Sequence, residues 1–374
     1  MRIRSVTASR LAVPLVDPFV IATARVDVTP SVLVRVELEH AGGVVVGLGE
    51  GACLPPVTGE TPEQVFVHVA RVCPELLDRT FDSPRAEAFA DLVGDALDEA
   101  PVTRSALQVA LLDALARAHR VHLTRLLAPT VRIPVAVVSD MTLPILPEAR
   151  MVALAEHWRA RGFRTFKVKV GKDLDADVRV LLAVAARVQD ARFRLDANEG
   201  YSVDEALRLA NACLARGLVL ECFEQPCARA AEGALEEVQA KLPAVPVIAD
   251  ESCRSEADLE RILAAKDRVG GINLKLVKHG GLLEAHALGE RARRAGLRVM
   301  VGGMVETRLG MSTAATLAAC FPEVLADLDT AWLLTEDPFV GGYEAEGERY
   351  LVGLGEGHGV SLASDPDSSA PLRP

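Results

Sequence analysis

Charged residues recur in the apolar strands of this chain at an almost constant interval. From Lys169, the steps to Asp196, Glu224, Asp250 and Lys275 are 27, 28, 26 and 25 residues. A surface charge has no reason to follow such a period. Residues at the carboxyl ends of successive strands in a β/α barrel do follow it, because the units are of similar length and all strands end at one rim. The period therefore predicts a parallel barrel with a charged rim.

Short β-rich runs alternate with helical segments over residues 133–340. The runs are VAVVSDMT, RTFKVKV, RFRLDAN, VLECFEQP, VPVIADE, GGINLKL, LRVMVGG and EVLADLD. Eight strands with seven intervening helices predict an α/β fold of the closed parallel type, a modified TIM barrel of (β/α)7β form.

The first 126 residues follow a different pattern and predict an α+β capping domain. Alternating residues on both sides of His40–Gly43 predict two strands joined by a hairpin. Residues 61–126 have apolar residues three and four positions apart, which predicts helices. Thr61 is a suitable N-cap, followed by proline at the first helical position.

Two C-terminal segments complete the expected organisation. Residues 341–362 are expected to return to the capping domain and complete it. Residues 363–374 are rich in proline, serine and aspartate, and this composition predicts a disordered tail.

Composition limits the classes of partner. The net charge of −11, without a basic stripe, argues against nucleic acid as a partner. The N-terminal apolar stretch is too short and interrupted for a signal peptide or a membrane span, so no membrane partner is expected. Seven cysteines without a CxxC pair predict buried free thiols and a cytoplasmic location.

Two lysines of the second strand and one of the sixth are candidate reactive groups. Lys167 and Lys169 share one face of a strand, and the apolar residues between and around them fit the outer face, so both should point into the barrel. Lys275 comes four units later, on the opposite wall. Two amines on opposite faces of a carbon are what a 1,1-proton transfer needs. The alternative is a pair of solvated lysines on an edge strand.

Three acidic residues lie between these lysines in the series. Asp196, Glu224 and Asp250 would repel one another at a rim unless a cation lay among them. Oxygen ligands without histidine or cysteine favour a hard ion, and we expect one Mg²⁺ per active site. Such a cation stabilises the enediolate that forms when a proton is removed next to a carboxylate. The alternative is a buried salt-bridge network with the lysines.

The combined motifs resemble the muconate-lactonizing branch of the enolase superfamily. The series KVK, DAN, FEQP, ADES and NLK spans the predicted barrel, and the mandelate racemase branch is disfavoured because LRVMVGGMVE lacks its histidine. The resemblance implies a capping domain on a (β/α)7β barrel and assigns roles as follows: Asp196, Glu224 and Asp250 as Mg²⁺ ligands, Lys169 and Lys275 as the acid/base pair, Lys167 as a contact to the substrate carboxylate, and Asn198 and Glu251 as residues that orient these groups.

The last strand ends in the sequence Asp327-Leu328-Asp329, whose two carboxylates share one face beside the predicted site. The motif resembles the D-x-D of dipeptide epimerases, where it holds a free α-ammonium. The stretches PLVDPF, GEGA, PVTGET and VGGMVE are similar to that group as well. The resemblance implies epimerisation of an L,L-dipeptide to the L,D form at its C-terminal residue. The alternative for the two aspartates is an Asx turn at the strand end.

Side-chain preference is expected to come from loops of the capping domain around residues 17–28 and 50–60. Arg25 is a candidate for binding an acidic side chain and Asp27 for a basic one, although exposure or mutual pairing is the alternative for both. Leu54 and its neighbours make the second loop apolar, and Thr142 is a further candidate contact. A moderately hydrophobic or broad range of dipeptides is expected.

Three rival functions remain open at this point. An N-acylamino acid racemase or a cycloisomerase of the same superfamily would act on substrates without a free amine. A Schiff-base lyase would use a buried lysine and no metal. A non-catalytic scaffold would have no use for the buried charges, which are expensive to keep. A homo-oligomer is expected from the resemblance alone.

Overall fold

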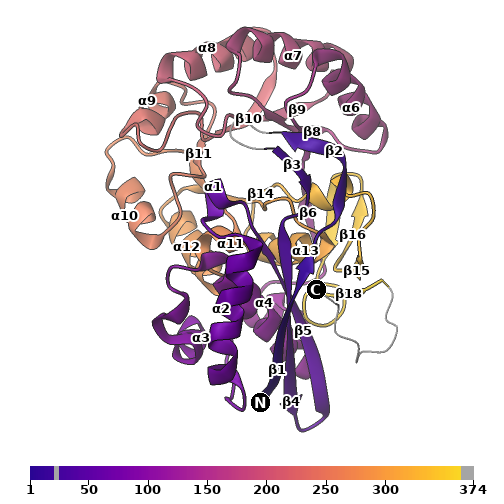
Figure 1. The fold of residues 1–374 in the computed structure, drawn as a ribbon. Coiled ribbons are helices and arrows are strands. Elements are labelled where there is room, and N and C mark those ends of the chain that lie inside the picture. The colour runs from indigo at the N-terminus through magenta and orange to yellow at the C-terminus, as the bar shows by residue number, and fades with distance from the viewer. Residues whose placement is uncertain (21–24, 364–374) are drawn as a thin grey trace.

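The computed structural model describes residues 1–20 and 25–363, with strands of the N-terminal part at one end and a ring of helices around parallel strands at the other (Figure 1). Part of the predicted loop 17–28 and nearly all of the predicted tail 363–374 lie outside the described residues. Within the described ranges, no helix combines the length and apolar character that a membrane crossing requires.

The N-terminal part contains a three-stranded antiparallel sheet covered by helices. Its strands are β1 (Arg2–Leu11), β4 (Ser31–His40) and β5 (Gly43–Ala52), and β4 pairs with β5 through His40 and Gly43, which confirms the predicted hairpin. The helices are α2 (Pro62–Leu76), α3 (Ala86–Val93) and α4 (Pro101–Ala118), and Thr61 caps α2 in a capping box, as predicted.

Helix α4 lies directly against the sheet because glycine replaces larger residues on β5. A Cβ at Gly47 would lie 1.9 Å from the backbone oxygen of Ala110, and one at Gly49 would lie 2.0 Å from that of Ala106. This close contact explains why α4 is buried along nearly its whole length. A small hairpin of β2 (Pro14–Val20) and β3 (Arg25–Val28) and the short helix α1 (Pro55–Thr58) extend toward the barrel.

The barrel sheet has eight strands, and neighbouring strands are parallel throughout, which confirms the predicted fold class. Its strands are β7 (Met141–Leu143), β8 (Thr165–Lys169), β9 (Arg192–Asp196), β10 (Val219–Glu224), β11 (Val247–Ala249), β12 (Gly271–Leu274), β13 (Arg298–Val301) and β14 (Leu325–Ala326).

Every gap between barrel strands contains a helix on the outside, as Figure 1 shows for α6 to α10 around the upper rim. The helices are α6 (Glu148–Ala160), α7 (Leu174–Arg187), α8 (Val203–Leu214), α9 (Ala234–Lys241), α10 (Glu256–Ala264), α11 (Leu276–His279), α12 (Leu282–Arg294) and α13 (Arg308–Ala318). Phe166 and Val168 of β8 are buried, as expected for residues beneath this layer.

The run VAVVSDMT differs from the prediction, because it forms two strands instead of one. Residues Val135–Val138 form β6, which pairs antiparallel with β17 (Arg349–Val352), and only Met141–Leu143 joins the barrel as β7. Buried Ser139 and Asp140 interrupt the run. The amide of Ser139 donates to the backbone oxygen of Glu348, so the chain changes partners at this point.

Side chains join the first and last barrel strands. The sheet order runs from β7 to β14, and the described residues show no ladder between these two strands. Instead, the amide of Leu328 donates to Ser139 Oγ at 2.9 Å, and the amide of Thr142 donates to Asp329 Oδ2. Polar side chains therefore close the barrel beside the Asp-Leu-Asp motif.

The C-terminal segment contacts the N-terminal part. Strands β15 (Phe339–Gly341) and β18 (Val360–Leu362) pair with each other, and β16 (Tyr343–Glu346) pairs with β17. His358 contacts both α4 and β5. Its amide donates to Asp113 of α4, and its ring contacts the backbone oxygen of Leu48 of β5. The domain boundaries themselves stay predictions. All seven cysteines are free, and six of them are buried.

Candidate active site

The five periodic residues lie where their strands end. Lys169, Asp196 and Glu224 are the last residues of β8, β9 and β10, and their registers align, with Lys169 opposite Asp196 and Asp196 opposite Glu224. Asp250 directly follows β11 and Lys275 directly follows β12. The order of the strands places the two lysines on either side of the three acidic residues.

A cleft lies over this rim, between the barrel and the N-terminal part. Residues from both parts line it: Phe19, Val26, Leu54, Val57, Thr142, Lys167, Lys169, Asn198, Asp250, Glu251, Lys275, Gly303, Met304, Val305, Asp327, Asp329 and Thr330. The floor of the cleft is charged, and the wall from the N-terminal part is apolar.

Each of the two outer lysines contacts a different carboxylate. Lys169 Nζ lies 2.5 Å from Asp196 Oδ2, and Lys275 Nζ lies 2.8 Å from Asp250 Oδ2. Burial acts to lower the pKa of Lys275, but Asp250 and Glu224 outweigh it, so that pKa lies above its usual range. A further cation bound by Asp250 and Glu224 would offset their effect on Lys275 and shift its pKa back toward the usual range.

Lys167 lies at the centre of the group and is 1% exposed. Its Nζ is 3.0 Å from Asp196 Oδ2, 2.7 Å from Glu224 Oε2 and 2.7 Å from Asp327 Oδ2. Burial opposes its charge, yet the carboxylates, of which Asp327 acts most strongly, raise the pKa of Lys167 well above its usual range. Lys167 therefore links the predicted metal ligands to the Asp-Leu-Asp motif.

The three predicted metal ligands differ in their electrostatic environment. Burial acts to raise the pKa of all three carboxyls. Lys169 and Lys167 reverse this effect for Asp196 and lower its pKa to about 2, and Lys275 and Lys278 lower the pKa of Asp250 well below its usual range. For Glu224 burial prevails and its pKa is raised, with Asp196 contributing in the same direction. Glu224 is thus the ligand most in need of a further positive charge.

Several buried oxygen atoms around these carboxylates suit a metal site. Glu224 Oε2 makes no hydrogen bond, because Lys167 Nζ approaches it without hydrogen-bond geometry despite the short distance. Asn198 Oδ1 and Glu251 Oε2 are also buried without a hydrogen bond. Unsatisfied buried oxygens are costly. The donor set is therefore suited to a hard divalent cation, which would take oxygen ligands from the three carboxylates.

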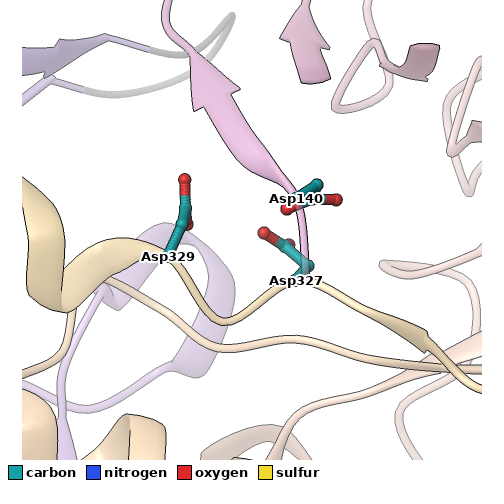
Figure 2. Close-up of side chains that lie close together, drawn as sticks. All are labelled: Asp140, Asp327 and Asp329. Carbon is teal, nitrogen blue, oxygen red and sulfur yellow. The ribbon is translucent and has the colours of Figure 1, made fainter. Parts of the chain in front are cut away.

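A second acidic group has its oxygens closer together. Asp140, Asp327 and Asp329 are buried, and one oxygen atom of each lies within 4.8 Å of the others. Figure 2 shows Asp140 at the start of β7, facing Asp327, with Asp329 farther along the segment that follows β14. Among the described residues, Asp196, Glu224 and Asp250 do not meet this separation, because the lysines lie against them.

The two aspartates of the motif do not act as turn caps. Asp329 precedes the short helix η2 (Thr330–Leu333), but its side chain makes no capping bond and instead accepts from Thr142 across the barrel seam. Burial, and then Asp327, raise the pKa of Asp329 to about 6. Thr142 itself lines the cleft, as predicted for a candidate contact.

Arg25 is not brought into the cleft. Its guanidinium bonds to Asp27 at 2.8 and 3.1 Å, and the two side chains are 62% and 57% exposed. Mutual pairing of Arg25 and Asp27 was the alternative to a role in substrate binding, so the structure gives no support to Arg25 as a substrate contact. In its place, Phe19 and Val26 of the β2–β3 hairpin present apolar side chains to the cleft.

The residues expected to orient the ligands contact one another. The amide of Asn198 donates to Asp196 Oδ1 at 3.0 Å, and its side-chain Nδ2 donates to Glu251 Oε1 at 3.2 Å. Burial raises the pKa of Glu251 to about 8, and Asp250 adds to the effect.

Two residues of the sixth unit were missed by the sequence analysis. Asn273 Nδ2 donates to Glu224 Oε1 at 2.7 Å, and its position two residues before Lys275 on one strand was the available signal. Lys278 Nζ donates to Asp250 Oδ1, to the backbone oxygen of Asp250 and to that of Asn273, at 2.6, 2.7 and 2.8 Å. No periodicity marks Lys278, which lies in the short helix α11.

If Asp250 is a metal ligand, as predicted, replacing Lys278 with methionine is expected to weaken the binding of a divalent cation about 10- to 100-fold, because Asp250 loses the group that fixes its orientation. The apo protein should also melt at a lower temperature, since a buried carboxylate loses a partner. Calorimetric titration with Mg²⁺ and thermal unfolding measure the two effects. Lys172→Met changes an exposed lysine and serves as the matched control. Unchanged Mg²⁺ affinity in a folded K278M protein would contradict the assignment.

Family models match both parts of the chain. The model described as mandelate racemase / muconate lactonizing enzyme, N-terminal domain, matches residues 3–128, and the model described as enolase C-terminal domain-like matches residues 150–366. Together they span the N-terminal part and the barrel.

Three relatives illustrate the range of the similarity. An L-Ala-D/L-amino acid epimerase from Populus trichocarpa is 38% identical over 95% of this chain and 83% of its own length. The structure of a substrate-liganded complex of the L-Ala-D/L-Glu epimerase from Bacillus subtilis has a TM-score of 0.90 and is 30% identical, covering 97% of this chain and all of that chain. An N-succinyl-L-Arg/Lys racemase from Bacillus cereus is 28% identical over 83% of this chain and 82% of its own length.

Proposed function

The chain belongs to the mandelate racemase and muconate lactonizing enzyme family, and from that membership we propose that it is a dipeptide epimerase that uses one Mg²⁺. Like its racemase and epimerase relatives, the enzyme is an isomerase. The proposed reaction inverts the α-carbon of the C-terminal residue of an L,L-dipeptide. The observation that carries the proposal is the placement of Lys169 and Lys275 on strands that flank the three acidic strands.

Asp196, Glu224 and Asp250 are proposed to hold the cation. When bound, the cation supplies the positive charge that stabilises negative charge developing on the substrate carboxylate. The unbonded oxygen of Glu224 and the orientation of Asp250 by Lys278 support this assignment. Lys167, which contacts both Asp196 and Glu224, is positioned to bind the same end of the substrate.

The two outer lysines are proposed to exchange the α-proton. One Nζ removes the proton from one face of the carbon, and the other returns a proton to the opposite face, so the configuration inverts. General acid–base groups of this kind contribute about 100- to 10,000-fold to a rate when they are positioned correctly. The contacts of Lys169 with Asp196 and of Lys275 with Asp250 keep each amine at its own side of the site.

The amino end of the dipeptide is proposed to bind at Asp327 and Asp329, which line the cleft. An ammonium in this place meets two buried carboxylates, whereas an N-acyl group would bring them no positive charge. This distinction favours a dipeptide over the N-succinyl amino acid that the Bacillus cereus relative is named for.

Apolar residues are proposed to bind the side chain of the residue that is inverted. Phe19, Val26 and Leu54 from the N-terminal part and Met304 and Val305 after β13 line the cleft. Because Arg25 is paired with Asp27, none of these wall residues offers a charge to an acidic or basic side chain. A hydrophobic C-terminal residue is therefore the expected preference.

A dipeptide library incubated with the enzyme and Mg²⁺ in D₂O tests the proposal. Mass spectrometry is expected to find one deuterium in dipeptides with an apolar C-terminal residue, and chiral separation should show the L,D product. Exchange limited to N-acylated amino acids would contradict the proposal and favour the racemase alternative.

The variant Asp327→Ala separates these two activities within one protein. It is expected to lose turnover of dipeptides and to spare any turnover of substrates that lack a free amine. Equal losses for both substrate types would contradict the assigned role of Asp327.

A further inference from the structure

Asp140 belongs to the close group of carboxylates but has no role in the reaction as proposed so far. It is fully buried and does not line the cleft, whereas Asp327 and Asp329 do. One of its oxygens lies within 4.8 Å of an oxygen of each of those residues (Figure 2). Its Oδ1 is buried and makes no hydrogen bond, and the same holds for Asp329 Oδ1. Asp140 and Asp329 therefore each have one buried carboxylate oxygen that accepts no hydrogen bond.

Arg194 holds Asp140 in this position. Arg194 Nη1 donates to Asp140 Oδ2 at 2.9 Å and to the backbone oxygen of Ala326 at 2.6 Å. The same guanidinium bonds to Glu221 through Nε at 2.9 Å, and Glu221 is also 3.3 Å from Arg192. Arg194 thus ties Asp140 to the residue that directly precedes Asp327.

Counting charges around the group gives a negative surplus. Within the described residues, the three carboxylates form ion pairs with two cations: Asp140 with Arg194, and Asp327 with Lys167. Both cations also pair with other acids, Arg194 with Glu221 and Lys167 with Asp196 and Glu224, and Asp329 is in none of the ion pairs found there. Burial raises the pKa of Asp140 well above its usual range, and Asp327 adds to the effect.

We propose that Asp140 is a positioning residue for the amino end of the substrate, because its carboxylate, held in place by Arg194, adds to the negative charge that an ammonium at Asp327 and Asp329 neutralises. The inference rests on the proposed function, since it needs a substrate with a free α-ammonium. It assigns to Asp140 a share in choosing substrates with a cationic amino end, without direct contact.

The substitution Asp140→Asn tests the proposal through a split between KM and kcat. KM for an apolar dipeptide is expected to rise about 10- to 100-fold, the size of a charge removed at short range in a protein. The kcat should change much less, because Asp140 makes no hydrogen bond or ion pair with Lys169 or Lys275, the two proposed acid/base groups. The inhibition constant of the N-acetylated dipeptide should not rise, since this ligand has no ammonium. Asp175→Asn, at an exposed acid, is the control.

The double variant D140N/R194M distinguishes charge from structure. Removing Arg194 as well restores the balance of charges, so the double variant should bind the dipeptide more tightly than D140N alone. A structural role predicts the reverse, because two buried partners are lost. An unchanged KM in D140N, equal weakening of both ligands, or no recovery in the double variant would overturn the inference. A wild-type protein that exchanges no dipeptide refutes the proposed function itself, whereas an active wild type with an unaffected D140N refutes this inference alone.

Discussion

Replacing Lys169 with alanine is expected to stop epimerisation while leaving proton exchange in one epimer of the dipeptide. The remaining amine, Lys275, still reaches the face of the α-carbon that it serves, so it exchanges that proton with solvent without inversion. The loss of epimerisation should be about 100- to 10,000-fold, the usual contribution of a general acid or base. Incubation of each separate epimer in D₂O, followed by NMR or mass spectrometry, measures the exchange.

Lys275→Ala is the matched variant for this experiment. It should retain exchange in the opposite epimer, because β8 and β12 lie on either side of β9, β10 and β11. Lys172→Ala, at an exposed lysine, should leave both exchanges intact. If both K169A and K275A lose exchange in the same epimer, the two amines serve one face and the inversion mechanism is wrong.

Replacing Glu224 with glutamine is expected to abolish Mg²⁺ binding and, with it, turnover. Glu224 is the central of the three proposed ligands, and one of its oxygens makes no hydrogen bond. Glutamine has a neutral amide in place of the carboxylate, so the site loses one of its three negatively charged ligands. Affinity for Mg²⁺, measured by calorimetry, should fall by about 100-fold or more. Chelation by EDTA should inactivate the wild-type enzyme and should be reversed by added Mg²⁺. A Schiff-base mechanism would survive chelation.

The variant Asp329→Asn is the control for the position of the cation. Because one carboxylate oxygen each of Asp140, Asp327 and Asp329 lies within 4.8 Å of the others, this group is the competing place for a metal ion. D329N is expected to keep the affinity for Mg²⁺ and to raise KM for dipeptides. If D329N loses the cation while E224Q retains it, the metal lies at the Asp-Leu-Asp motif and the assignment of the two acidic groups is reversed.

The first predicted barrel strand forms two strands, β6 and β7, and the sequence pattern could not predict this division. An apolar run predicts a strand, but the partner of its first half, β17, lies far along the chain, with Val138 opposite Arg349, whereas its second half pairs with the next barrel strand, β8. The mutual pairing of Arg25 and Asp27 was available as an alternative, yet only the packing of the hairpin decided between it and a place in the cleft.

The sequence by itself determined the barrel and the five charged strand ends, because the interval between successive units appears directly in the chain as a period of about 27 residues. The sequence also predicted that Asp327 and Asp329 share one face of a strand end, but both follow β14, and the fold after the strand is what brings an oxygen of each close to the other. Only the tertiary structure decided that Lys278 holds Asp250 and that Arg194 holds Asp140 next to the motif. These contacts join side chains of different barrel units without a fixed spacing along the chain, so they arise from the packing of the fold and leave no periodic signal.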